Sequence, residues 1–300
     1  MERTQILFFM KTAETEHMTR AADELNVSQP YLSNSISELE AELGVKLFDR
    51  VGRGIQINDF GKILYDYCSR MVGLEKDMIN SINARKKIFV NQIKIATNAS
   101  LYMPWLVAEL RKKLPDANIR LYLMTKTNIC RLMSKGDLDF GIVGPQVPEE
   151  FDKTLLIADR GLVIYPKNHW LSGKKVASID DIKNEVFIGT RRGFAMTDVL
   201  NLYFDKCSLG QKIYVETSDT NSALQFVKTG VGISLAPESV LQLDPYFQDK
   251  YVQLREVPHR GPVYLFWRSG QYMDSLSEKF MTVTKQYFEH LSEGNTILQD

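Results

Sequence analysis

The sequence Met18-Thr-Arg-Ala-Ala-Asp-Glu-Leu-Asn-Val-Ser-Gln-Pro-Tyr-Leu-Ser-Asn-Ser-Ile-Ser-Glu-Leu-Glu40 predicts two short helices joined by a tight turn. Thr19 is placed to cap the first helix, and the small residues Ala21 and Ala22 on its buried side allow a neighbouring helix to approach closely. Residues 26–28, Asn-Val-Ser, form the predicted turn. This stretch therefore predicts a compact helical pair near the N-terminus.

The second predicted helix has one apolar and one polar face. Ser28 can cap it, and Pro30 is tolerated in its first turn, where the amide needs no helical partner. Apolar residues at helical spacing form its buried face, namely Leu32, Ile36, Leu39 and Leu43. The opposite face presents Pro30, Asn34 and Ser37. It is flanked by Ser33 and Glu38, and Gln29 lies at its leading end. Amides and hydroxyls of this kind can read base edges in DNA, whereas the simpler alternative is a helical hairpin with a solvated polar face.

A short hairpin is predicted to follow the second helix. In Val51-Gly-Arg-Gly-Ile-Gln-Ile-Asn58, a Gly-Arg-Gly tip lies beside short apolar strands. Arg50 and Arg53 would lie on such a wing, where an arginine meets phosphate or the minor groove.

Residues 1–66 resemble the winged helix-turn-helix of LysR-type transcriptional regulators. The residues that carry the resemblance are Phe9, Ala13, Thr19-Arg-Ala-Ala22, Leu25, Val27-Ser-Gln-Pro30, Leu32-Ser33, Ile36, Leu39-Glu40, Leu43-Gly44, Leu47-Phe48, Arg50, Arg53 and Gly61. The chain departs from the family at Asn34, Ser35 and Ser37, where the family often has Arg or Lys, and at residues 58–61, where it usually has Thr-x-Ala-Gly. The first departure leaves the operator sequence open.

The polar helix face, the wing and the resemblance together predict a surface for double-stranded DNA. Its candidate DNA-binding residues are Arg20, Ser28, Gln29, Pro30, Ser33, Asn34, Ser37, Arg50 and Arg53. Ten acids outnumber six bases in the first sixty residues, which counts against DNA binding by net charge. The expected contact surface is nevertheless largely free of acids, so we expect binding whose strength depends on dimerisation.

The composition is that of a globular chain with two or three domains. Its 300 residues are 44% hydrophobic and 25% charged, with 37 basic and 37 acidic residues. We expect no membrane-spanning segment and no signal peptide, and therefore a cytoplasmic protein. Cys68, Cys130 and Cys207 are far apart, which predicts buried thiols rather than a disulfide framework or a metal site.

Enzymatic motifs do not occur in the sequence. The patterns GxGxxG, GxxxxGK, GxSxG and HExxH are absent, and His17, His169, His259 and His290 lack ligand spacing. The acids at 137, 139, 180 and 181 are typical of solvated turns. We therefore expect no catalytic residue, no metal and no cofactor.

Residues 59 to about 87 predict one long helix with an apolar seam. The seam repeats every three or four residues through Phe60, Leu64, Tyr67, Met71, Leu74 and Met78. Such a stripe needs a partner, and the resemblance implies a linker helix that pairs two chains in a homodimer or homotetramer. The alternative is packing against the helix's own domain.

The remaining residues predict an α/β fold in which strands and helices alternate. The strand-like runs are 92–96, 119–124, 140–143, 162–165, 186–188, 212–215, 232–235 and 263–267. The helical runs are 104–114, 129–135, 194–207, 221–229, 238–241 and 274–291. The whole resembles the periplasmic-binding-protein-like effector domain of the same family.

We therefore expect three parts in the chain. These are a winged helix-turn-helix at 1–58, a linker helix at 59–88 and an effector domain at 89–300. The effector domain would comprise subdomain I, residues 89–161 and 268–300, and subdomain II, residues 162–267, with the chain crossing between them near residues 161–162 and 267–268.

A small-molecule effector is expected at the carboxyl ends of the strands, where helix N-termini offer free amides. Segments rich in hydroxyls begin at Thr97, Thr125, Thr190 and Thr217. The candidate effector-binding residues are Ser100, Lys126, Thr127, Thr190, Arg191 and Thr217. The basic side chains favour an anion, preferably a carboxylate, while the alternative for each hydroxyl is an ordinary helix cap.

The leading hypothesis is a DNA-binding transcriptional regulator whose promoter binding is modulated by that effector. One rival is a solute-binding module, which gives no reason for a helix-turn-helix. The other is a structural or redox-responsive DNA-binding protein that keeps the cleft empty or switches through Cys207.

Overall fold

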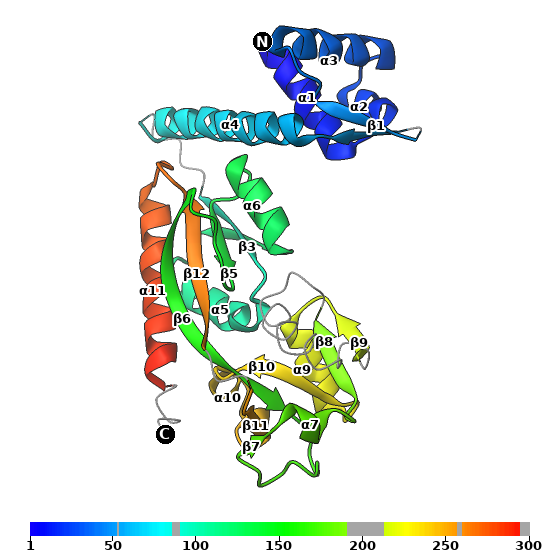
Figure 1. Cartoon of the computed structure of the whole chain (residues 1–300). Coiled ribbons are helices and arrows are strands. Elements are labelled where there is room, and N and C mark those ends of the chain that lie inside the picture. Colours follow the sequence, from blue (N-terminus) through cyan, green and yellow to red (C-terminus); the bar gives the residue numbers. More distant parts are fainter. Residues whose placement is uncertain (53, 86–90, 191–212, 257–259, 295–300) are drawn as a thin grey trace. The chain divides into compact units, whose positions relative to one another are not determined.

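The computed structural model describes residues 1–52, 54–85, 91–190, 213–256 and 260–294. The chain divides into two compact units, Met1–Met78 and Ile79–Asp300 (Figure 1). The predicted helix at 194–207 lies outside the described residues, as do Arg53, Arg191 and Cys207.

The N-terminal unit is a winged helix-turn-helix, as predicted. Its elements are α1 (Arg3–Thr15), α2 (Met18–Leu25), α3 (Gln29–Leu43), β1 (Phe48–Val51), β2 (Gly54–Ile57) and the first part of α4 (Asp59–Arg85). The core is formed by Ile6, Phe8, Phe9, Met10, Ala21, Ala22, Leu32, Ile36, Leu39, Leu47 and Cys68. Leu43 was expected in this core but is 40% exposed, because α3 ends there and Gly44 adopts a left-handed conformation.

The cap of α2 differs from the prediction. His17, not Thr19, is the N-cap residue, and its Nδ1 accepts the backbone N–H of Arg20 at 3.3 Å. The helix therefore begins at Met18, so Thr19 lies inside its first turn and is exposed. An imidazole nitrogen can accept the same bond as a hydroxyl oxygen, and for this reason the sequence pattern was misread.

The wing is the antiparallel pair β1–β2, with Phe48 opposite Ile57 and Val51 opposite Gly54. Gly52 in its turn has φ of 58°, a left-handed conformation that favours glycine. Gly61 at the start of α4 lies so close to the wing that a Cβ there would clash with the carbonyl oxygen of Leu47. This close approach explains why glycine stands at this position.

The C-terminal unit is built on a mixed sheet. The strands are β3 (Gln92–Thr97), β4 (Asn118–Leu123), β5 (Phe140–Val143), β6 (Phe151–Ile164), β7 (Val176–Ala177), β8 (Phe187–Thr190), β9 (Ile213–Thr217), β10 (Ile233–Pro237), β11 (Tyr251–Leu254) and β12 (Arg260–Arg268). They pair in the order β4-β3-β5-β12-β6-β10-β8-β9, with β11 on β6 and β7 on β11.

Strand β6 passes from one subdomain to the other. Residues 151–160 pair with β12, whereas residues 161–164 pair with β10. We propose that the chain crosses between the subdomains at this change of partner, at the position expected near 161–162. All described residues of β12 pair with β6 or β5, so we propose that the return crossing lies before residue 260 rather than near 267–268.

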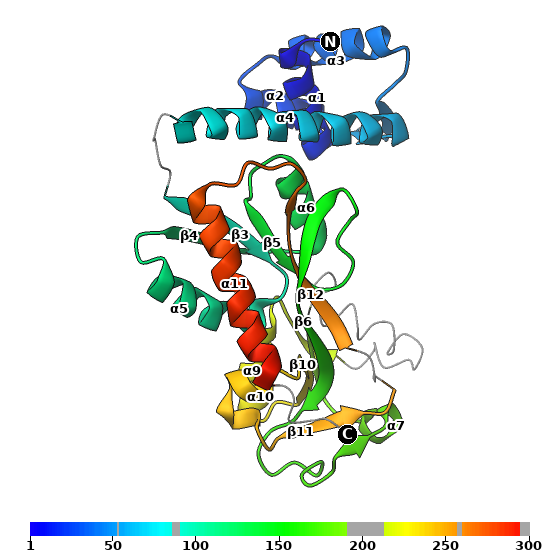
Figure 2. The same ribbon diagram turned by 90° about the vertical axis from the view of Figure 1, so that its left-hand side faces the viewer.

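The helices of this unit pack against the mixed sheet. They are α5 (Met103–Lys113), preceded by η1 (Ser100–Tyr102), α6 (Lys126–Ser134), α7 (Ile179–Ile182), α9 (Thr220–Lys228), α10 (Val240–Leu243), followed by η4 (Pro245–Phe247), and α11 (Ser275–Gly294). Helices α5 and α11 lie side by side and α11 follows β6 in both views (Figures 1 and 2). One hydrophobic core joins α5, α9, α10 and α11 across the two subdomains.

The sequence runs predicted most strands and helices but missed the short helices η1, α7 and η4 and three strand features. The first part of β6, residues 151–161, was not predicted, and neither were β7 and β11. Residues 152–155 of β6, Asp-Lys-Thr-Leu, are largely exposed, and three of the four are polar or charged, so they carry no continuous apolar signal. β7 is only two residues long.

Candidate DNA-binding surface and effector site

Helix α3 exposes the polar face that the sequence predicts. Gln29, Pro30, Asn34 and Ser37 are exposed, whereas Ser33 is half-buried. Ser28 is the N-cap residue, and its Oγ accepts the backbone N–H of Tyr31 at 3.4 Å. Leu32, Ile36 and Leu39 are at most 3% exposed on the opposite face, so the core fixes which side of α3 faces outward.

The polar side chains on this face also interact with one another. Asn34 Nδ2 donates to Glu38 Oε1 at 2.8 Å, and Ser37 Oγ donates to the carbonyl oxygen of Ser33 at 2.9 Å. Glu38 is exposed. The face is therefore an ordered polar surface with one acid beside its central amide.

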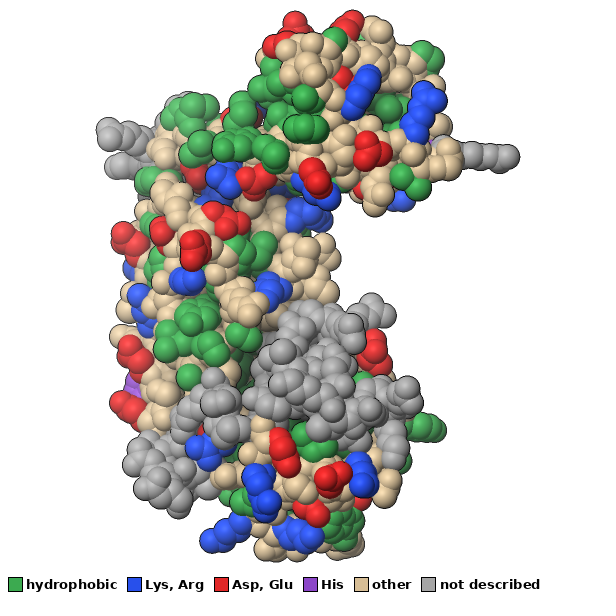
Figure 3. Space-filling model, in the orientation of Figure 1, with side chains coloured by type: hydrophobic (Ala, Val, Ile, Leu, Met, Phe, Trp, Pro, Cys, Tyr) green, Lys and Arg blue, Asp and Glu red, His purple; other side chains and the backbone are tan. Residues whose placement is uncertain are grey.

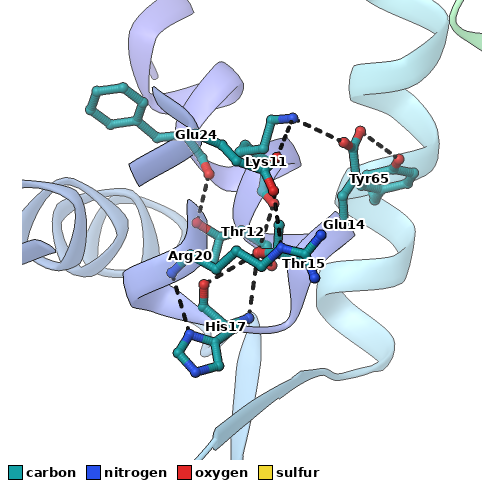
Figure 4. A network of polar contacts seen from close by, with 9 residues as sticks. Lys11, Thr12, Glu14, Thr15, His17, Arg20, Glu24 and Tyr65 are labelled. Carbon is teal, nitrogen blue, oxygen red and sulfur yellow. Dashed lines mark hydrogen bonds and ion pairs between the residues drawn. The ribbon is translucent and has the colours of Figure 1, made fainter. Parts of the chain in front are cut away.

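The predicted basic contacts have different environments. Arg20 is exposed, but its Nε donates to Glu24 Oε1 at 3.0 Å within a polar network that also contains Lys11 (Figure 4). Hydrogen bonds from Lys11 and Arg20 lower the pKa of Glu24. Arg50 on β1 is exposed. Arg20 must therefore exchange or share its carboxylate partner to contact a phosphate, whereas Arg50 already faces solvent.

The long helix α4 has two apolar stripes. Leu64, Tyr65, Cys68 and Val72 pack into the N-terminal core. A second stripe is exposed and consists of Phe60, Ile63, Tyr67, Met71, Leu74 and Met78, each 49–64% exposed. Hydrophobic side chains gather along α4 in Figure 3. Leu64, which the sequence pattern placed in the seam, thus belongs to the domain core, and Ile63 takes its place in the exposed stripe. We call the six exposed residues the α4 stripe.

The carboxyl ends of β3, β4 and β5 meet at one edge of the sheet. Asn98 Oδ1 accepts the backbone N–H of Gly144 at 3.0 Å, after β5. Lys126 Nζ donates to the carbonyl oxygen of Pro145 at 3.0 Å, so the loop after β4 is fastened to the same segment. Thr127 is the second residue of α6, and it is exposed.

Ser100 links this edge to the second subdomain. Its Oγ accepts the backbone N–H of Thr220 at 3.1 Å, and Asn221 Nδ2 donates to the Ser100 carbonyl oxygen at 2.9 Å. Both partners lie in the first turn of α9. The N-terminus of α9 therefore binds directly to η1, and Ser100 is only 2% exposed.

A second buried link lies beside the first. Tyr102 Oη and Ser239 Oγ both donate to Asp159 Oδ2, at 2.7 and 2.5 Å. Burial and the neighbouring Asp159 charge raise the pKa of Tyr102 well above its ordinary value, so its hydroxyl remains a donor. We call the residues of both links the joint: Ser100, Tyr102, Asp159, Thr220, Asn221 and Ser239.

Thr190 and Thr217 lie opposite each other at the ends of β8 and β9. Both are nearly buried, at 7% and 8% exposed, and Thr217 Oγ1 donates to the Asp219 carbonyl oxygen at 2.8 Å. Thr217 is three residues before Thr220, so the loop that carries it also carries the bond to Ser100. The described contacts thus associate Ser100 with this loop but do not bring Thr127 to it, and Arg191 lies outside the described residues.

Sequence reasoning missed Asn98, Asn221 and Asp159. Asn98 stood inside a segment already singled out, but its role is a bond to a strand distant in sequence. Asp159 had no signal, because the strand around it was not predicted. His17 and Glu38 were noted in the sequence without a role.

Both described cysteines have raised pKa values, which disfavours the reactive thiolate form. Burial raises the pKa of Cys68, and burial together with Glu150 raises the pKa of Cys130 to about 11. In the described part of the chain, His, Cys, Asp and Glu do not form a group of three or more that could hold a metal ion. Each described helix is too short or too polar to cross a membrane.

An ordered polar recognition face and a two-subdomain α/β domain define a DNA-binding regulator with a ligand-binding domain. The helix-turn-helix model of bacterial regulatory proteins of the lysR family matches residues 4–62, and the LysR substrate binding domain model matches residues 91–289. The chain therefore belongs to the LysR family.

Similar proteins carry regulator names. The uncharacterized HTH-type transcriptional regulator YybE of Bacillus subtilis is 28% identical, over 98% of this chain and 100% of its own. The crystal structure of full-length BenM is 25% identical with a TM-score of 0.52 and covers 100% of both chains. A full-length OxyR variant from Pseudomonas aeruginosa is 18% identical with a TM-score of 0.60, over 100% of this chain and 99% of its own, which shows the fold alone.

Proposed function

We propose that this protein binds promoter DNA in the cytoplasm as a homodimer or homotetramer and that a small anion, most simply a carboxylate, modulates this binding. The α3 face would enter the major groove, and the wing would contact the backbone. The anion would bind between the subdomains, between Ser100 on one side and Thr190 and Thr217 at the ends of β8 and β9 on the other.

The bond between Ser100 and α9 is the observation that carries this proposal. Ser100 Oγ accepts the Thr220 amide, which is one of the free donors at a helix N-terminus. Its hydroxyl hydrogen can still be donated to an anion, and Thr190 and Thr217 lie at the ends of β8 and β9, which pair with each other. A ligand at this edge touches both subdomains, so it can favour one arrangement of them over another.

One basic side chain and one helix N-terminus support an anion. Lys126 holds its ammonium beside the loop after β5, and the α9 N-terminus contributes the positive end of its dipole. A carboxylate would accept bonds from Ser100 and Thr190 in the geometry that charged acceptors prefer.

Replacing Ser100 or Thr190 with Ala should weaken binding of that anion. A hydrogen bond to a charged group contributes about 1.5 to 3 kcal/mol, so affinity should fall about tenfold or more in each variant. Isothermal titration of the full chain with acetate, benzoate, succinate, phosphate and sulfate would measure this. Thr229→Ala, an exposed threonine after α9, is the matched control and should bind like the wild type.

The same variants distinguish residues that bind the anion from residues that only stabilise the fold. Affinity for DNA without ligand should stay within twofold of the wild type. Normal anion affinity in both variants would place the site elsewhere, and a loss of ligand-free DNA affinity would mean that these residues hold the fold together.

Replacing Arg50 with Ala should weaken binding to all DNA sequences alike. A phosphate contact carries charge rather than base identity, so the slope of log affinity against log salt should fall by about one. Fluorescence anisotropy would test this, with a selected duplex and a random duplex, at salt concentrations from about 50 to about 300 mM. Lys113→Ala, an exposed base on α5, should leave the slope unchanged. An unaltered slope in the Arg50 variant would remove the wing from the contact surface.

A further inference from the structure

Asn34 stands at the centre of the exposed α3 face, and Glu38 stands one turn further along the same face. The Asn34 amide nitrogen donates to the Glu38 carboxylate at 2.8 Å. Both side chains are exposed, so the bond is made on the surface that would meet DNA. Figure 1 shows α3 in the helix-turn-helix unit.

The carboxylate fixes which way the amide points. Turning the Asn34 amide over would place its carbonyl oxygen against a carboxylate that only accepts hydrogen bonds, so that orientation is repelled. In the observed orientation one N–H is used by Glu38. The second N–H and Oδ1 remain, and together they form the donor–acceptor pair that recognises N7 and N6 of adenine.

The same carboxylate has a general effect on DNA affinity. A negative charge on the groove face is repelled by phosphates in every sequence, so it lowers affinity for all DNA. In the free protein an exposed pair of this spacing contributes little to helix stability. Its main effect is therefore expected on recognition and not on folding.

We infer that Glu38 is a positioning residue that orients the Asn34 amide for a base contact, preferably with adenine. The inference rests on the proposed use of α3 as the recognition helix. Glu38 orients the Asn34 amide, and its negative charge lowers affinity for DNA. The combination lowers affinity for all sequences but raises selectivity among them.

Selection of duplexes from a randomised pool by the full chain, followed by affinity measurements, would test this. Asn34→Ala identifies the base pair that Asn34 reads, as the position where the variant loses preference. Glu38→Ala should reduce the ratio of matched to mismatched affinity at that same base pair by about tenfold, which is within the range of one good base contact. It should also raise affinity for random duplex, because a negative charge has been removed.

The variant Glu38→Gln should restore the base preference that Glu38→Ala loses. Its amide oxygen can still accept from Asn34, so the base preference should largely return, while affinity for random duplex stays raised. Glu42→Ala removes an exposed acid one turn further along α3 and should raise random-duplex affinity without changing the preference. Thermal unfolding of each variant checks that the domain is intact.

Three outcomes would overturn the inference. If Asn34→Ala loses a base preference and Glu38→Ala keeps it, Glu38 does not position Asn34. If Glu38→Ala changes preference at a different base pair, Glu38 reads a base itself. If Asn34→Ala alters no base preference, the use of α3 as the recognition helix fails, and the inference fails with it.

Discussion

The double change Tyr67→Glu and Leu74→Glu should convert the full chain to a monomer. Both residues belong to the α4 stripe and are 61% and 64% exposed, so they can be charged without entering the domain core. A carboxylate buried without a partner in a helix–helix seam costs on the order of several kcal/mol. Two of them in each chain should weaken pairing by orders of magnitude. Sedimentation velocity would measure the change.

Lys62→Glu with Asn80→Glu is the matched control. Both positions are exposed and lie on the side of α4 away from the stripe. This variant adds acidic residues to the same helix and should sediment like the wild type. An unchanged oligomer in the Tyr67 and Leu74 variant would reject the stripe as the pairing surface, and equal dissociation in both variants would point to general charge repulsion.

Asp159→Ala should strongly destabilise the C-terminal unit. Asp159 is 6% exposed and accepts the hydroxyls of Tyr102 and Ser239, which come from different subdomains. Removing the shared acceptor takes a partner from two buried donors, and a buried donor left unsatisfied costs about 1 to 3 kcal/mol. We expect a loss of about 3 kcal/mol or more in the free energy of unfolding, measured with urea.

Variants of the donors show whether the cost comes from the bonds. Tyr102→Phe should destabilise the wild type but cost much less in the Asp159→Ala background, because its acceptor has already gone. A loss within about 0.5 kcal/mol for Asp159→Ala, the range of ordinary surface changes, would show that the joint is not held by this carboxylate.

The N-terminal fold was predictable because its signals are local. The spacing of Leu32, Ile36 and Leu39 and the cap at Ser28 specify α3 within one stretch of chain. The predicted N-cap residue of α2 was wrong because His17 supplies an imidazole acceptor, which is rarely used at helix N-caps. The predicted seam of α4 matches its exposed apolar stripe except at Leu64, which packs into the core. Helical spacing alone cannot distinguish two adjacent apolar stripes.

The effector site was less predictable because its bonds join residues far apart in the sequence. Ser100 and the Thr217 loop were both singled out as strand-end segments, and the contact between Ser100 and Thr220 joins them. That Ser100 would bind the N-terminus of α9 could not be read from either segment. Asp159 lies in a stretch whose strand is specified by pairing with β12 rather than by an apolar run, so the joint had no local signal.

The account's central claim is that a small anion changes how this protein occupies DNA. A DNase I footprint on the selected duplex, with the full chain and increasing concentrations of the carboxylate that binds best by titration, tests it most directly. The protected region should change in extent or occupancy at the concentration that half-saturates the protein, and Ser100→Ala should need about tenfold more ligand for the same change. A footprint that is identical at zero and saturating ligand would contradict the account.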